Sequence, residues 1–226
     1  MSGGVEALQD WNEQYGDIVA FPEKTGAGAA GGNVFRFDYG MAYACRVRDA
    51  KVVRSKFGDL QIEMKLDVQG DDGDHEDVPV VGQTRIWLDL PKQSSDLGKD
   101  RALVQKMIAR RYQNLLRVLS AAAPATYALY AERKGNPPHY TYVGFDGEKM
   151  SPGDFNERKI SMQTACVEFA EELYGKEGEP IDILEGALFY VEKVENKKNA
   201  KYPYTNYYAT TPEKVPVFKG GESAPF

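Results

Sequence analysis

Apolar and polar residues alternate along three segments in the first half of the chain. In residues 60–68 an apolar side chain occupies every second position, with polar or charged side chains between them. This pattern predicts a strand with one face in a core and the other in water. Residues 41–54 and 80–90 alternate similarly, and the turn signal Ser-Lys-Phe-Gly-Asp at 55–59 separates the first two segments. The three segments are therefore predicted to form an antiparallel meander.

Two of these predicted strands depart from simple alternation. The phase of the first slips between Val47 and Val53, which predicts a β-bulge in a strongly bent strand. In the third, Trp87 lies on the polar side, two positions from Arg85. A tryptophan at such a position is either covered by another segment or exposed as a stacking platform next to the arginine.

The second half of the chain begins with helical periodicity. Residues 98–122 carry apolar side chains at helical spacing with basic residues between them, which predicts an amphipathic helix. Residues 124–160 contain several tyrosines and turn signals and are predicted to include a small β-rich insertion. A second helix is expected at about 161–174. Two strands at about 183–195 and 202–210 are expected to form a final hairpin.

Three strands, a helix-bearing connection and a final hairpin follow the order of an OB-fold, a small barrel that binds oligonucleotides through strands 2 and 3 and the 1–2 and 4–5 loops. We therefore expect a mainly β fold with α insertions, built as an OB-fold barrel with an elaborated connection between strands 3 and 4. The predicted domain spans 34–216 with an insertion at 124–160, and 217–226 is a flexible tail. Residues 1–33 form an N-terminal segment and a Gly/Ala-rich linker, whose GxGxxG at 26–31 lacks the following helix of a dinucleotide site.

The composition is that of a folded domain. With 226 residues and 42% hydrophobic content, the chain can build a core. It contains no run of roughly 18 apolar residues and no signal-peptide pattern, so we expect a soluble protein of the cytoplasm. Cys45 and Cys166 are expected to be buried free thiols.

The formal net charge of -6 argues against a generic nucleic-acid binder, because the phosphate field favours positive charge. The charges are, however, unevenly distributed. Residues 59–77 contain eight acids and one base, whereas residues 36–56 contain six bases and two acids. An acidic total can therefore coexist with a basic groove.

The last predicted hairpin combines lysines at its turn with tyrosines along its return strand. Cations track a phosphate backbone and flat rings stack on bases regardless of their identity, so this pairing suits single-stranded nucleic acid. The alternative is a tyrosine-rich core strand with solvated lysines. Strand alternation puts Tyr204 and Tyr208 on one face and Tyr207 on the other. The candidate nucleic-acid-binding residues are Arg46, Arg48, Lys56, Phe57, Arg85, Trp87, Lys197, Lys198, Lys201, Tyr202, Tyr204, Tyr207 and Tyr208.

The stretch LEGALFYVEKVENKKNAKYPYTNYYATTP, with its apolar strand, basic turn and YP-containing return strand, is similar to a segment of the single-stranded DNA-binding proteins of tailed bacteriophages. Residues 41–90 and 183–216 carry this resemblance. It implies a role in DNA replication, recombination or repair in the cytoplasm of an infected bacterium, with single-stranded DNA and replication proteins as partners. The terminal Pro225-Phe226 resembles the tip that such proteins offer to partners, although the usual acidic run before it is missing and a frayed terminus is the alternative.

The sequence offers little support for catalysis. Walker A, HExxH, paired CxxC and GxSxG motifs are absent, so we expect neither enzymatic activity nor a cofactor. The strongest enzymatic alternative is a Mg²⁺-dependent nuclease, in which Asp59 and Glu63 hold the metal and Lys65 stabilises charge. A structural or protein-interaction module is the remaining alternative, and it predicts no salt-sensitive affinity for DNA.

Overall fold

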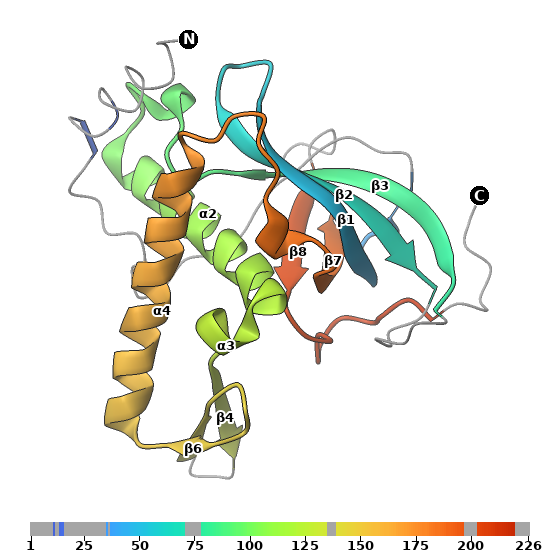
Figure 1. Ribbon diagram of the computed structural model, residues 1–226, viewed down its shortest axis with the longest axis vertical. Coiled ribbons are helices and arrows are strands. Elements are labelled where there is room, and N and C mark those ends of the chain that lie inside the picture. Colours follow the sequence, from blue (N-terminus) through green and yellow to red (C-terminus); the bar gives the residue numbers. More distant parts are fainter. Residues whose placement is uncertain are drawn as a thin grey trace.

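An antiparallel sheet of five strands is the centre of the fold (Figure 1). In this computed structural model the described residues are 11, 14, 15, 35, 37–70, 78–134, 139–196 and 203–219. The strand order is β3-β2-β1-β7-β8, and within the described part of the chain no ladder joins the two edge strands. The strands are β1 (Ala42–Arg54), β2 (Leu60–Gln69), β3 (Val80–Asp89), β7 (Leu188–Val194) and β8 (Tyr204–Tyr208).

The predicted meander of the first three strands is confirmed. Strand β2 pairs with β1 on one side and with β3 on the other, both antiparallel. The register of β1 shifts between Val47 and Asp49, so the predicted bulge lies at Arg48. Gly58 closes the β1–β2 turn at a φ of 89°, a left-handed conformation that glycine adopts without a Cβ penalty.

The connection between β3 and β7 contains most of the helical residues that the structure describes. It comprises η1 (Ser94–Asp96), α2 (Arg101–Ala122), α3 (Pro124–Tyr127), β4 (Tyr130–Lys134), β5 (His139–Val143), β6 (Lys149–Met150), α4 (Pro152–Leu173) and η2 (Asp182–Leu184). Strands β4 to β6 form the predicted β-rich insertion, a separate sheet at the end of α4 farthest from the main sheet (Figure 1). Because α2 and α4 have 22 residues each, the fold is mixed α/β rather than mainly β.

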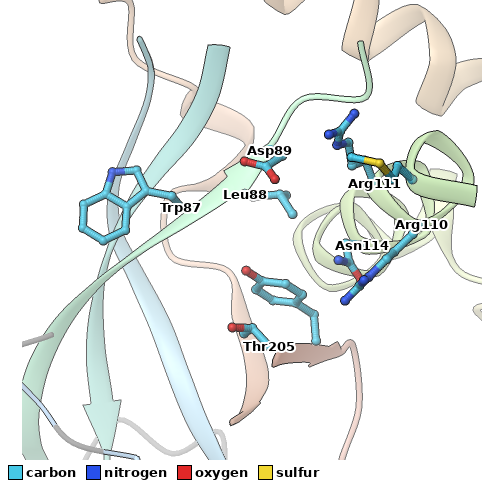
Figure 2. Close-up of a pocket in the computed structure, with 9 residues that line it drawn as sticks. Trp87, Leu88, Asp89, Arg110, Arg111, Asn114 and Thr205 are labelled. Atoms are coloured by element: carbon cyan, nitrogen blue, oxygen red, sulfur yellow. The ribbon is translucent and has the colours of Figure 1, made fainter. Parts of the chain in front are cut away.

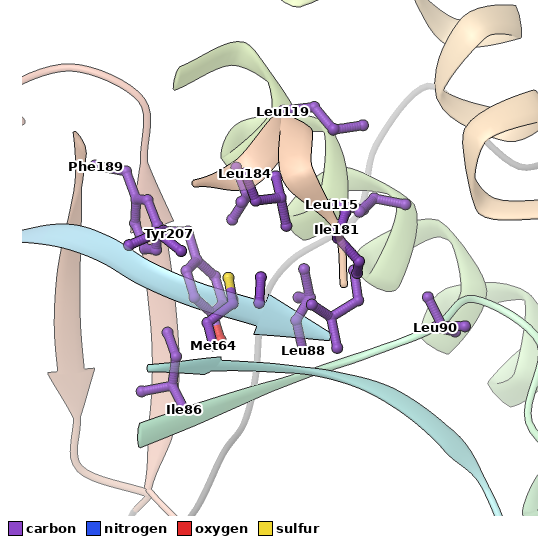
Figure 3. Close-up of a cluster of buried hydrophobic side chains, with 14 of the residues drawn as sticks. Met64, Ile86, Leu88, Leu90, Leu115, Leu119, Ile181, Leu184, Phe189 and Tyr207 are labelled. Carbon is purple, nitrogen blue, oxygen red and sulfur yellow. The ribbon is translucent and has the colours of Figure 1, made fainter. Parts of the chain in front are cut away.

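Helix α2 covers the inner face of the sheet and completes the core (Figure 3). The Asp100 side chain accepts a hydrogen bond from the backbone of Leu103 and so begins the helix. Leu115 and Leu119 on its apolar stripe are fully buried against inward residues of the sheet such as Ile86 and Phe189. Each of these leucines contributes about 1.5 to 3 kcal/mol by leaving water.

Aromatic rings cover the inner face of the sheet near the start of β1. Tyr43 contacts Phe35 and Phe37 edge-on, at centroid distances of 5.5 and 5.2 Å, and stacks on Phe218 at 5.0 Å. Phe218 is buried, and its backbone N–H donates to the carbonyl of Ala42. The packed body thus extends past the boundary predicted at residue 216.

Two aromatic residues of the N-terminal segment also belong to the core. Trp11 and Tyr15 are buried, and the Tyr15 hydroxyl donates to the carbonyls of Asp96 and Lys99. The Asp96 carboxylate, which is fully buried, accepts two hydrogen bonds from the Arg111 guanidinium of α2. The N-terminal segment, η1 and α2 are therefore held together by one buried polar cluster.

Four predicted features lie outside the described residues. They are the Gly/Ala-rich linker, residues 71–77 of the acid-rich stretch, the lysine-bearing turn at 197–202 and the last residues, 220–226. Of the helices that the structure describes, none has the length and apolar character needed to cross a membrane.

Candidate nucleic-acid interface

Lys56, Phe57 and Trp87, three of the predicted binding residues, line one groove. Lys56 and Phe57 come from the β1–β2 turn, and Trp87 comes from the outer face of β3. The groove has a volume of about 560 Å³, and Arg54 and Arg111 also line it. The structure therefore brings predicted residues from two separate segments to one surface.

The β1–β2 turn presents an aromatic ring and a cation to solvent. Phe57 is 74% exposed, and the Lys56 ammonium lies 4.9 Å from the centre of its ring. The Arg54 guanidinium holds the turn by donating to the Gly58 carbonyl at 2.7 Å and to the Glu177 carboxylate. A large exposed apolar ring on a braced turn has no role in the core and suits contact with a ligand.

Trp87 lies on the outer face of the sheet, as strand alternation predicted. Its cross-strand neighbour on β2 is Glu63, whereas Ile86 and Leu88 point into the core. The indole is half-buried and lines the groove, so part of it is accessible. The close-up of the neighbouring pocket shows the indole on the opposite side of β3 from Arg110 and Asn114 of α2 (Figure 2).

Arg85 shares this outer face but is held by an acid. Its guanidinium donates to the Glu63 carboxylate at 3.0 Å, and the Lys51 ammonium lies 3.8 Å from the same carboxylate. The Arg85 side chain remains 50% exposed. It is therefore a fixed cation beside Trp87 that still faces solvent.

Arg46 and Arg48 are not brought to the groove. The Arg46 guanidinium donates to the Gly186 carbonyl at 3.2 Å and lines a different hollow, near the end of β8. Arg48 is the bulge residue of β1, and its guanidinium lies 3.9 Å from the Asp67 carboxylate. The charge pattern of the first strand grouped these arginines with Lys56, but the strand carries them away from the β1–β2 turn.

The tyrosines of β8 divide between two faces, as alternation predicted. Tyr207 is 2% exposed and packs against Phe189, so it belongs to the core and its predicted stacking on bases is corrected. Tyr204 and Tyr208 are half-buried on the other face. The Tyr208 hydroxyl donates to the Glu192 carboxylate at 2.6 Å, and burial, followed by that carboxylate, raises its pKa to about 12.

Six predicted residues lie outside the part of the chain that the structure describes. They are Lys197, Lys198, Lys201 and Tyr202 of the β7–β8 turn, and Pro225 and Phe226 of the terminal tip. Lys193, which precedes this turn in sequence, is buried within the sheet.

A second pocket, of about 230 Å³, adjoins the groove and was not predicted (Figure 2). The two hollows share Trp87, Asp89 and Arg111. Its walls come from β3, β8 and α2, and Arg110 contributes a guanidinium 5.5 Å from the Tyr204 ring. Burial lowers the pKa of Arg110 to about 10, against the opposing effect of nearby Tyr204 and Asp89.

The three residues of the nuclease alternative are held by separate partners. Asp59 accepts hydrogen bonds from the side chain of Ser94 and the backbone of Ser95, and so anchors η1. Glu63 bonds Arg85, and the Lys65 ammonium lies 2.5 Å from the Asp49 carboxylate. Within the described ranges, no cluster of three His, Cys, Asp or Glu side chains is placed to hold a metal ion.

Comparison with family models, with curated proteins and with solved structures finds no match for this chain.

Proposed function

We propose that this protein binds single-stranded DNA with little dependence on sequence. The observation that carries the proposal is the groove that combines the exposed Phe57 ring, the half-buried Trp87 indole and the Lys56 ammonium. Rings of this kind stack on bases of any identity, at about 1 to 3 kcal/mol per base, while cations follow the phosphate backbone. A duplex hides its base faces, so this combination favours an unpaired strand.

The strand order supports a more specific proposal, that the sheet is an OB-fold barrel. The first strand lies at the centre of the sheet between the second and the fourth, and the third and fifth are the two edges. One pocket takes its walls from both edge strands, β3 and β8, and from α2, which supports this proposal. OB-folds bind oligonucleotides on strands 2 and 3 and on the 1–2 loop, which correspond to the groove.

The surrounding charges agree with binding that is moderate in strength and salt-sensitive. Arg85 lies beside Trp87 on the same face with half of its side chain exposed. Glu63 partly neutralises it, which limits nonspecific attraction to duplex DNA. Lys197, Lys198 and Lys201 of the 4–5 loop would extend the cationic path.

The resemblance to phage single-stranded DNA-binding proteins suggests where such an activity would act. In the cytoplasm of an infected bacterium, a sequence-tolerant binder would protect strands exposed during replication, recombination or repair. The terminal Pro225-Phe226 would then recruit replication proteins. On this proposal the protein is a binding protein and not an enzyme.

Titration of tryptophan fluorescence with oligo(dT) at two salt concentrations tests the proposal. Trp11 and Trp87 are the two tryptophans, and Trp11 is buried, so quenching on binding reports mainly Trp87. We expect saturable quenching by oligo(dT), weaker binding at higher salt and much weaker binding of a duplex. Equal binding of duplex DNA, or an affinity that ignores salt, would contradict the proposal.

A parallel incubation with Mg²⁺ separates binding from cleavage. If the oligonucleotide is recovered intact, the protein acts as a binder. Degradation that depends on Mg²⁺ and is lost in Glu63→Gln would instead support the nuclease alternative.

A further inference from the structure

The pocket between β3, β8 and α2 contains a guanidinium that the fold leaves unsatisfied. The Nε and Nη2 atoms of Arg110 are buried and have no hydrogen-bond partner among the described residues. A buried donor without a partner costs about 1 to 3 kcal/mol, and more when it is charged. The Tyr204 ring lies 5.5 Å from the guanidinium and restrains it. Arg111, in contrast, donates to the Asp96 carboxylate and to the Pro91 carbonyl.

An acceptor faces the same pocket from β3. The Oδ1 atom of Asp89 accepts a hydrogen bond from Gln61 at 2.5 Å, which fixes the carboxylate at the rim. In the described part of the chain Asp89 and Arg110 do not form an ion pair. Both nevertheless act electrostatically on the Tyr207 hydroxyl, since Asp89 raises and Arg110 lowers its pKa, which burial dominates. The pocket is therefore lined by a cation and an anion that do not pair with each other.

This arrangement selects the ligand by charge and by size. A phosphate would satisfy Arg110 but would be repelled by Asp89, so a neutral ligand is favoured. The volume of about 230 Å³ is below the range of about 300 to 1,000 Å³ that drug-sized ligands occupy, which leaves room for one flat ring system. Leu88 and Met107 supply apolar walls for such a ring.

We propose that this pocket holds a single guanine base of the bound strand. Guanine has two neighbouring acceptors, O6 and N7, which match the two unsatisfied N–H groups of Arg110, a pairing common in nucleic-acid recognition. Its N1–H and N2–H groups lie on the adjacent edge and match the Asp89 carboxylate. The other three bases offer no such pair of acceptors beside a pair of donors. Bases of a single strand are read on these edges because they are free to turn away from their neighbours.

The guanine pocket rests on the proposed DNA binding. It adds one position that selects guanine to a groove that accepts any base. The two hollows adjoin each other, because Trp87, Asp89 and Arg111 line both of them. A strand that stacks on Trp87 can therefore insert its neighbouring base into the pocket without leaving the groove.

Fluorescence anisotropy with oligo(dT) of about 12 nucleotides, compared with the same strand carrying one central dG, dA or dC, tests the pocket. We expect the dG strand to bind about tenfold more tightly than oligo(dT), and dA or dC to change affinity less than threefold. Arg110→Gln should remove the dG preference and leave oligo(dT) affinity within about threefold. Asp89→Asn should also remove the preference, measured as the ratio of dG-strand to oligo(dT) affinity of that variant. The matched control is Arg117→Gln, because Arg117 is an exposed arginine of the same helix outside the pocket. This variant should retain the preference for dG.

Two results would overturn the guanine pocket and can be told apart from failure of DNA binding. If oligo(dT) binds but a central dG gives no gain, or if the gain survives both variants, the pocket proposal fails while the proposed function stands. If oligo(dT) does not bind at all, the proposed function fails. Competition between dGMP and deoxyribose 5-phosphate for the free protein then tests the pocket alone. Binding of dGMP abolished by Arg110→Gln supports the pocket, whereas equal binding of both compounds, or of neither, contradicts it.

Discussion

Lys193 lies in the core, where an ammonium group is rarely found without a carboxylate. Only 7% of the residue is exposed. Its Nζ donates to the Thr205 hydroxyl at 2.8 Å and lies 5.9 Å from the centre of the Phe37 ring. Burial lowers its pKa to about 8, although the nearby Cys45 acts in the opposite direction. Lys193 shares the inner face of β7 with Phe189 and Val191, and its partner Thr205 is set by the register of β7 against β8.

The low pKa of Lys193 predicts that the protein becomes more stable as pH rises. The unfolded chain keeps this lysine protonated up to about pH 10.4, so it binds more protons than the folded protein above about pH 8. The free energy of unfolding should therefore rise between these two values, by up to about 3 kcal/mol from this group. Chemical denaturation of the wild type and of Lys193→Met across pH 7 to 10 measures the difference. Parallel curves for the two proteins would show that the buried lysine is not deprotonated.

Trp87 and Ile86 are adjacent on β3 but lie on opposite faces of the sheet, so variants of the two residues can be compared directly. Trp87→Ala should weaken oligo(dT) binding by about 1 to 3 kcal/mol with a smaller loss of stability, because the indole is half-buried on the outer face. Ile86→Ala should lower the free energy of unfolding by about 2 to 5 kcal/mol, because Ile86 is 2% exposed in the core. Affinity of the folded fraction and denaturant midpoints measure both effects. The reverse pattern would place Trp87 in the core and outside the DNA path.

Among the elements, those with a strong local pattern were predicted closely. The meander, its bulge and helix α2 follow from alternation and helical spacing that neighbouring residues alone determine. Helix α4 begins at Pro152, earlier than the expected 161, because its first half is mostly exposed and shows little apolar periodicity. Its start was nevertheless encoded by Ser151, which caps the helix by accepting from the backbone of Asp154.

The candidate site was only partly predictable, because it combines elements that are distant in sequence. Lys56 and Trp87 could be recognised from their neighbours in the sequence, because Lys56 is a cation at a turn and Trp87 is an indole on the polar face of a strand. The role of Arg110 depends on which side of α2 faces the pocket that β3 and β8 also line, and adjacent arginines in a helix give no indication of this. Tyr15 bonds Asp96 of η1, and Trp11 lies against the Lys92 ammonium, and their own segment reveals neither contact.

The β1–β2 turn should contribute to binding through two separable effects. Lys56→Ala should reduce the slope of log affinity against log salt by about one unit, because one phosphate contact and its released counterion are lost. Phe57→Ala should weaken binding by the same factor at low and high salt, because a ring on a base releases no counterion. Salt titrations of the two variants against wild type measure this. Identical slopes for Lys56→Ala and wild type would place this turn outside the DNA path.

At the scale of the whole molecule, the N-terminal part of the chain is fitted to the sheet through Gly82 of β3. A Cβ at this position would lie 2.3 Å from Cδ2 of Phe35, whose ring is itself enclosed by Phe37 and Tyr43. Gly82→Ala should therefore displace the Phe35 ring and destabilise the protein by about 1 to 3 kcal/mol. Gly82→Ala combined with Phe35→Leu should cost less than the sum of the two single changes. Strict additivity in denaturation experiments would show that the ring does not rest on this glycine.

The central strand is completed by residues that lie far downstream in the sequence. Strand β1 pairs with β2 almost as soon as both exist, but its other side is paired by β7, and Ala42 also pairs with the segment that carries Pro216 and Phe218. A nascent chain on the ribosome therefore carries a meander in which one hydrogen-bonding edge of β1 stays uncovered until β7 has been synthesised. Such an edge can recruit a second chain, so a messenger truncated before β7 yields a product prone to aggregate instead of a smaller working domain.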